Sequence, residues 1–200
     1  MDVGSLFSGI GGIELGFERA GGFEVKWFVE KEPYCQAVLR KHWPRVPIYG
    51  DITTIDFTKL PKVDLLTGGF PCQDISVAGK RKGLAGARSG LWKQYARAIG
   101  EIRPKIAFIE NVPNLVNEGF NVVLANLAEM GYDAEWCCVC ASDFGALHKR
   151  ERIFVIAYAN GKRCNNSKHL VKKDSGCLLQ NKEWGNSPPC WGGGKRGGLD

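Results

Sequence analysis

The feature that most constrains the fold of this sequence is a regular alternation of short apolar runs with helical patterns between residues 3 and 158. Val63–Thr67 is short and mostly apolar, as buried strands are, whereas Leu91–Ile102 repeats apolar residues at helical spacing. The same patterns predict strands at 3–7, 23–30, 63–67, 106–111, 132–140 and 152–158, and helices at 12–20, 33–42, 91–102 and 120–130. Strands that alternate with helices predict an α/β fold with a doubly wound, mostly parallel sheet, in which an antiparallel pairing of the last two strands stays open.

A change of composition at Gly161 divides the chain of 200 residues. The hydrophobic content of 44% suits one substantial core, which we assign to residues 1–160. Residues 161–200 are rich in Gly, Asn, Ser, Lys and Pro, and they hold eight basic and three acidic residues of a chain whose net charge is +6. We therefore expect residues 161–200 to be an incomplete second unit or a flexible tail. Its basic excess suits either solubility or contact with nucleic acid.

No segment of the sequence resembles a membrane span, because no apolar run reaches the ~20 residues that cross a bilayer. The N-terminus does not resemble a secretory signal, because it lacks a basic region before an apolar stretch. We therefore expect a cytoplasmic protein without a membrane partner. Cys137 and Cys140 make one C-x-x-C within an expected strand, and no second matched pair accompanies them. This spacing favours cysteines in the core or on the surface over a zinc site, and we expect no metal.

The first expected strand leads into a glycine-rich turn, Phe7-Ser8-Gly9-Ile10-Gly11-Gly12. Such glycines let a ligand approach the backbone closely and leave free N–H groups at the start of a helix. The turn lacks the full G-x-G-x-x-G pattern, so a dinucleotide is not favoured. Glu30 ends the second strand and Asp51 ends a short third one. Either acid alone fits a cap or a solvated residue, but together with the turn they favour a nucleoside-bearing ligand.

The sharpest feature is Gly68-Gly69-Phe70-Pro71-Cys72-Gln73, which opens at the carboxyl edge of the sheet, where ligands bind. A lone cysteine is usually a small buried hydrophobe, but a cysteine beside glycines at the mouth of a site is a candidate nucleophile. Pro71 fixes the backbone just before Cys72. Residues 79–90 then place glycines among basic residues, namely Lys80, Arg81, Lys82 and Arg88. This segment is either a plain solvated loop or one that closes over a polyanion.

Two charged groups lie near the end of the regular pattern. Glu110-Asn111 ends the strand at 106–111, which places a carboxylate at the same edge of the sheet as Cys72. Glu110 is a candidate proton donor there, or otherwise a helix cap. Residues 148–152, His-Lys-Arg-Glu-Arg, precede the last strand, and their arginines can grip a phosphate or a base carbonyl, although such clusters are more often plain surface.

Taken together and in this order, these residues resemble the cytosine-5 DNA methyltransferase family. Leu6–Gly12 is similar to its first motif, Gly50–Ile52 to its third and Gly69–Gln73 to its catalytic motif. Glu110–Val112 and Lys149–Arg152 resemble two later motifs. The ordered set is far more specific than any one motif. The resemblance implies a Rossmann-like methyltransferase fold, S-adenosylmethionine as cofactor, and double-stranded DNA with a flipped cytosine as substrate.

The resemblance also implies a role for each motif residue. It makes Cys72 the nucleophile and Glu110 the group that supplies a proton to ring nitrogen 3, while Arg152 orients Glu110 and Asn111 fixes the backbone at Pro71. It assigns cofactor binding to Phe7, Ser8, Gly9, Gly11, Gly12, Glu30, Asp51, Ile52, Gly69 and Leu91. It assigns DNA binding to Gln73, Ser76, Lys80, Arg81, Lys82, Arg88 and Arg150.

One departure from the family concerns the end of the chain. A target-recognition region and a final Gly-Asn motif follow these motifs in the family, but only about forty residues follow Arg152 here. We therefore expect the chain either to be truncated or to be completed by a separate chain, and to have little activity alone. His148 also stands where Gln is common. The alternatives are an RNA cytosine-5 methyltransferase, an inactive cofactor-binding fragment, and a nucleotide-dependent oxidoreductase, which would not need Cys72 or Arg152.

Overall fold

The computed structural model describes residues 1–71, 90–117 and 119–160. Its strands are β1 (Asp2–Leu6), β2 (Glu24–Val29), β3 (Ile48–Tyr49), β4 (Leu65–Gly68), β5 (Ile106–Asn111), β6 (Tyr132–Cys140) and β7 (Glu151–Ala159). Its α-helices are α1 (Gly12–Ala20), α2 (Pro33–His42), α3 (Gly90–Ile102) and α4 (Phe120–Glu129). Short 3₁₀ turns lie at Ile52–Thr54, Phe57–Lys59, Pro113–Val116 and Ala141–Phe144. Strands and helices therefore alternate along the described chain as the sequence predicts.

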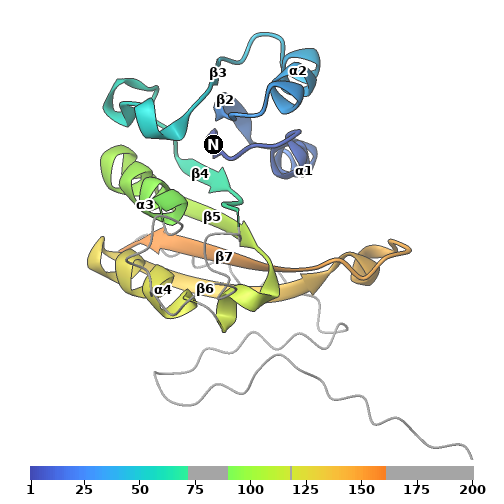
Figure 1. Cartoon of the computed structure of the whole chain (residues 1–200), viewed down its shortest axis with the longest axis vertical. Coiled ribbons are helices and arrows are strands. Elements are labelled where there is room, and N and C mark those ends of the chain that lie inside the picture. The colour runs from blue at the N-terminus through green and yellow to red at the C-terminus, as the bar shows by residue number, and fades with distance from the viewer. Residues whose placement is uncertain (72–89, 118, 161–200) are drawn as a thin grey trace, which may run out of the picture.

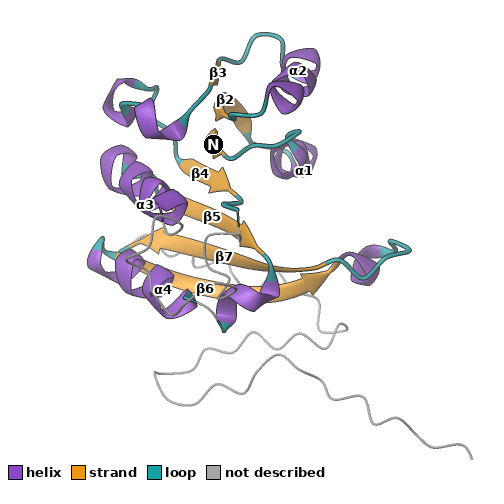
Figure 2. Cartoon of the chain, viewed as in Figure 1, coloured by secondary structure: helices purple, strands orange, loops and turns teal. Residues whose placement is uncertain are grey.

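Within the described residues the strands form a single mixed sheet in the order β3-β2-β1-β4-β5-β7-β6 (Figures 1 and 2). The pairs β1–β2, β1–β4, β2–β3 and β4–β5 are parallel. Strand β7 runs antiparallel to both β5 and β6. The expected doubly wound, mostly parallel sheet is confirmed, and the pairing left open for the last two strands is antiparallel.

Strand boundaries differ from the predictions where a local feature turns the chain. The first strand ends at Leu6 because Phe7 has a φ of +51°, which bends the backbone away from the sheet. The strand expected from Val63 begins at Leu65, two residues later than predicted. Asp51 was expected to end a strand. It lies beyond β3 instead and caps a 3₁₀ turn through its side chain.

Helices cover both faces of the sheet, as the alternation of side chains requires. In β4, Leu65 packs into a cluster with Phe28 and Leu39, while its neighbour Leu66 packs into a second cluster with Tyr95. The first cluster lies under α1 and α2, and the second lies under α3 and α4 (Figure 1). The apolar face of α3 includes Trp92, which is 2% exposed, whereas Leu91 is only partly buried. The buried face of α3 is therefore rotated slightly toward Trp92, relative to the face that the apolar spacing of Leu91–Ile102 predicts.

The predictions for residues 161–200 lie outside the described residues, so the division of the chain after residue 160 stays a prediction. None of the helices in the described part of the chain is both long and apolar enough to cross a membrane.

Candidate active site

The predicted site residues gather at one edge of the sheet, because the carboxyl ends of parallel strands meet there. The glycine turn follows β1, Glu30 follows β2, and Gly69 follows β4. Glu110 lies at the end of β5. Arg152 reaches the same edge from the opposite direction, since β7 is antiparallel to β5 and begins where β5 ends. The fold therefore brings together residues that are distant in the sequence.

The glycine turn between β1 and α1 is shaped by left-handed backbone conformations. Gly9 and Gly11 have φ of +54° and +83°, values that favour glycine. At Gly11 a Cβ atom would lie 2.5 Å from the ring of Trp43, so a larger residue would not fit. The hydroxyl of Ser8 accepts a hydrogen bond from Ser5 Oγ at 2.7 Å. These features hold the turn in one conformation at the N-terminus of α1.

The two acids predicted to bind a nucleoside are oriented by backbone amides. Glu30 Oε2 accepts from Gly9 N at 2.7 Å, and its Oε1 accepts from Glu32 N at 2.8 Å. Asp51 Oδ1 accepts from the amide and the hydroxyl of Thr53 at 2.9 and 2.7 Å. The backbone hydrogen bond from Thr53 is the main reason that the pKa of Asp51 lies below its usual value, and the Lys31 ammonium at 2.9 Å lowers that pKa further. Asp51 is therefore an anionic acceptor at neutral pH.

Glu110 and Arg152 form an ion pair at the end of β5. Arg152 Nε lies 2.8 Å from Glu110 Oε1, and the exposed fractions of the two side chains are 26% and 25%. Arg152 Nη1 also donates to the carbonyl of Glu151 at 2.8 Å. A guanidinium held at two points has a fixed direction, so it fixes the direction of the carboxylate beside it.

Gly69 and Asn111 define the backbone that leads toward Cys72. A Cβ atom on Gly69 would lie 2.5 Å from Glu110 Oε2, so the absence of a side chain lets the carboxylate approach. Buried Asn111 donates from Nδ2 to the carbonyl of Phe70 at 3.0 Å. Pro71 follows at once and is exposed. Asn111 was predicted to fix the Pro71–Cys72 backbone. The hydrogen bond that the structure describes is one residue earlier, to the carbonyl oxygen of Phe70.

Several predicted site residues stand apart from these contacts. Phe7 is half-buried and stacks with Tyr95, with ring centroids 6.3 Å apart. Ile52 is buried behind Asp51, and Gly12 begins α1. Arg150, with a φ of +31°, precedes β7 and is exposed. Cys72, Gln73, Ser76, Lys80, Arg81, Lys82 and Arg88 lie outside the described residues.

Sequence reasoning missed a buried carboxyl behind the glycine turn. Glu14 in the first turn of α1 is 1% exposed, and its Oε1 accepts from Thr67 Oγ1 at 2.6 Å. Its Oε2 has no hydrogen-bond partner among the residues that the structure describes. Burial raises the pKa of Glu14, and hydrogen bonds from Thr67 and Ser5 oppose that shift. The sequence signal was weak, because an acid in a first helical turn normally interacts with the helix dipole at the surface.

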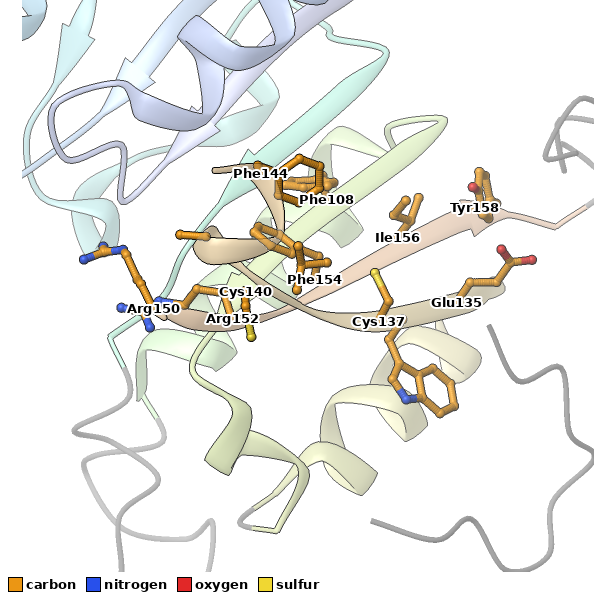
Figure 3. A pocket seen from close by; sticks show the side chains of 13 residues that line it. Phe108, Glu135, Cys137, Cys140, Phe144, Arg150, Arg152, Phe154, Ile156 and Tyr158 are labelled. Carbon is orange, nitrogen blue, oxygen red and sulfur yellow. The ribbon is translucent and has the colours of Figure 1, made fainter. Parts of the chain in front are cut away.

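An apolar pocket of about 490 Å³ lies next to the ion pair, over β5, β7 and β6 (Figure 3). Phe108, Phe154 and Ile156 form its floor. Arg150 and Arg152 lie toward one end, and Tyr158 lies toward the other (Figure 3). Among the described residues, this face of the sheet is therefore apolar and uncovered next to Arg152.

The family model for C-5 cytosine-specific DNA methylase matches residues 1–183 of the chain. The chain belongs to this family. The resemblance drawn from the motifs and the expected methyltransferase fold are thereby confirmed, and the expected cofactor, S-adenosylmethionine, agrees with the family.

Individual relatives in this family match a similar stretch of the chain. Type II methyltransferase M.Bsp6I of Bacillus sp. (strain RFL6) is 37% identical over 166 residues, which are 80% of this chain and 53% of that protein. Type II methyltransferase M2.BsuMI of Bacillus subtilis (strain 168) is 42% identical over 165 residues, 78% of this chain and 42% of that protein. The Entamoeba histolytica methyltransferase EhMeth shares the fold, with a TM-score of 0.68 at 21% identity over 80% of this chain and 53% of that one. The chain spans about half the length of the curated relatives that it matches.

Proposed function

We propose that this chain transfers a methyl group from S-adenosylmethionine to carbon 5 of cytosine in double-stranded DNA. The observation that carries the proposal is the convergence of Glu110, Arg152 and Asn111 on the backbone that leads into Cys72. A carboxyl group and a guanidinium at this edge, with the thiol of Cys72 two residues after Phe70 in the sequence, provide the groups that addition to a pyrimidine ring requires. Membership of the DNA methylase family supports the same reaction.

The proposed chemistry begins at carbon 6, because carbon 5 of cytosine is a poor nucleophile on its own. The Cys72 thiolate forms a bond to carbon 6, and the displaced electron pair moves toward carbon 5 and ring nitrogen 3. Glu110 supplies a proton to nitrogen 3 as charge builds there, while Arg152 holds Glu110 and the base carbonyl. The bound cofactor supplies an electrophilic methyl group to carbon 5. Loss of the carbon-5 proton to solvent water then restores the ring double bond and expels the Cys72 thiolate, and nitrogen 3 returns its proton to Glu110.

The residues at the ends of β1, β2 and β3 fit the proposed cofactor. The positive φ values at positions 9 and 11 favour glycine. Because Gly9 and Gly11 have no side chains, a ligand can approach the backbone of the turn. Glu30 and Asp51 present carboxylate oxygens, which complement the hydroxyl and amino hydrogens of an adenosine group. The half-buried ring of Phe7 is available to contact the adenine.

We expect the target cytosine to flip out of the double helix before it reacts. Unstacking and unpairing of this base cost a few kcal/mol. Contacts from basic residues to phosphates offset that cost, and Arg150 at the edge of the sheet is one candidate among the described residues. The others proposed, from Lys80 to Arg88, lie outside the described residues. This part of the proposal rests on the family and on charge.

We further propose that a polypeptide with the remaining family elements covers the open face of β5, β7 and β6. Its apolar floor of Phe108, Phe154 and Ile156 is unusual for a surface that faces only water. Relatives are about twice as long as the match, so they carry material that can cover it. Mixing the chain with the C-terminal half of a relative should give a stable complex and raise methylation. A mixture that stays as two separate species, as measured by light scattering, would contradict this.

The test of the reaction is a covalent trap. The purified chain, with and without that C-terminal half, is incubated with S-adenosylmethionine and duplex DNA that contains 5-fluorocytosine, which cannot lose its group at carbon 5. We expect a protein–DNA adduct that resists denaturation, and no adduct for Cys72→Ser. Cys35→Ser, at a half-exposed cysteine on α2, is the matched control and should trap normally. An adduct in the Cys72→Ser protein would assign the nucleophile to another residue. Efficient trapping on transfer RNA but not on DNA would instead favour an RNA substrate.

A further inference from the structure

We infer that Arg97 is a positioning residue for cofactor binding, because its guanidinium fixes the backbone that carries Asp51. The inference rests on the proposed function, in which Asp51 receives the amino group of the adenine. Arg97 lies in the middle of α3, and neither the motifs nor the expected contacts of the family residues include it. Its contacts with this part of the site are to residues 52–57 and not to the Asp51 carboxylate, so we expect it to act through that segment.

The guanidinium of Arg97 contacts both ends of the 3₁₀ turn Ile52–Thr54. Its Nη2 donates to the carbonyl of Ile52 at 2.8 Å, and its Nη1 donates to the carbonyl of Ile55 at 2.9 Å. Its carbon Cζ lies 4.8 Å from the ring centroid of Phe57, in cation–π contact. One rigid side chain therefore holds three points of a short segment whose first residue is the Asp51 acceptor.

Two further contacts fix the guanidinium itself. Its Nε donates to Gln94 Oε1 at 2.8 Å, and its Nη1 forms an ion pair with Glu101 Oε1 at 3.1 Å. Glu101 in turn accepts from the amide of Phe57 at 3.2 Å. Arg97 is about one-third exposed. The arrangement uses the planar fork of an arginine, since donors on three nitrogens point to separate acceptors, and a lysine ammonium cannot reach them all.

Helix α3 also supports the other parts of the site, which makes it a common platform. Tyr95 stacks with Phe7 of the glycine turn, and Trp92 packs against Phe70, with ring centroids 5.4 Å apart. The same helix therefore sets the positions of the turn after β1, the segment after β4 and, through Arg97, the segment after β3. Of these supports, the one from Arg97 can be altered with little change to the core.

The experiment compares Arg97→Lys with Arg103→Lys. Arg103 follows α3, donates to the carbonyl of Met130 and lies 5.7 Å from the ring of Tyr132, so the control loses the same kinds of contact away from Asp51. Calorimetry with S-adenosylmethionine should show affinity reduced about tenfold for Arg97→Lys and changed by less than about twofold for Arg103→Lys. Hydrogen exchange of the amides of Thr53 and Thr54, which bond to Asp51, should speed up only in Arg97→Lys.

A double-mutant cycle distinguishes positioning of Asp51 from general destabilisation. If Arg97 acts through Asp51, Arg97→Lys weakens binding in the wild-type chain but adds little in an Asp51→Ala background. Equal affinity of Arg97→Lys and wild type, additive losses in the cycle, or an equal loss in Arg103→Lys would overturn this inference alone. A wild-type chain that binds no S-adenosylmethionine would overturn the proposed cofactor site as well.

Discussion

Arg152 and Glu110 meet across strands β7 and β5, with Nε and Oε1 2.8 Å apart and each side chain about three-quarters buried. Burial of an ion pair carries a desolvation cost, so stability alone does not explain the pair. The pair lies at the edge of the sheet, and its carboxylate is next to Gly69. This position instead indicates that Arg152 orients Glu110.

Replacement of Arg152 should affect chemistry more than cofactor binding. In Arg152→Ala, Glu110 loses the partner that orients it, and we expect the methylation rate to fall by about a hundredfold or more. The affinity for S-adenosylmethionine should stay within about twofold of wild type. Transfer of a tritiated methyl group and calorimetry measure the two effects. Lys105→Ala, which breaks an ion pair with Asp64 away from this edge, is the control and should leave the rate unchanged.

Gly69→Ala should damage the same pair without altering a charge. The new Cβ would lie 2.5 Å from Glu110 Oε2, so the carboxylate must shift from the position in which it pairs with Arg152. We expect a methylation rate at least tenfold lower, by the same reasoning about a misplaced acid. Gly16→Ala is the matched control, because nothing lies within 4 Å of its added Cβ, and it should stabilise α1 by about 0.5–1 kcal/mol. An unaffected rate in Gly69→Ala would show that Glu110 is not held where the reaction needs it.

Glu30 and Asp51 are predicted to bind the cofactor. Glu30→Ala and Asp51→Ala should each weaken S-adenosylmethionine binding by about 1–3 kcal/mol, the range for a lost charged hydrogen bond. Glu32→Ala removes an exposed neighbour whose side chain makes no cap hydrogen bond, and it should bind normally. Calorimetry decides the point. Unaltered affinity in both variants would remove the two acids from the cofactor site.

The buried carboxyl of Glu14 should make stability depend on pH. Its pKa is raised by burial, so the folded chain binds a proton there that the unfolded chain releases above a pH of about 4.5. The stabilisation is therefore complete below that pH and is lost as pH rises through the raised folded pKa. Glu18 is the nearby charge that raises this pKa further, and Thr67, Ser5 and the phenol of Tyr95 are the other groups around the carboxyl.

Glu14→Gln should remove this pH dependence, because an amide is neutral at all pH values and resembles the protonated acid. The free energy of unfolding of wild type should fall relative to Glu14→Gln as pH rises from about 5 to 8, which urea titrations measure. In this window the Asp51, Asp56 and Asp64 carboxyls, whose pKa values are lowered, have already ionised in both states. Parallel stability curves for the two proteins would rule out titration of Glu14.

Much of the fold was predictable because its signals are local. The helices α1 and α2 and the strands β5 and β6 have the bounds that apolar spacing indicated. Errors fell at strand ends. The left-handed backbone at Phe7 ends β1 one residue early, and a single φ value leaves no periodic trace in the sequence.

The sequence by itself determined the succession of strands and helices along the chain, the family, and the residues that carry its motifs. The spacing of apolar residues and the residue types along the chain are enough for these. Tertiary structure decided which of those residues touch. The antiparallel entry of β7 sets Arg152 beside Glu110, and the lack of a side chain at Gly69 leaves room for the carboxylate. It also decided that Glu14 is buried and that Arg97 holds the segment after Asp51. Burial and hydrogen-bond partners depend on which segments pack together across the sheet, and one-dimensional patterns do not record that packing.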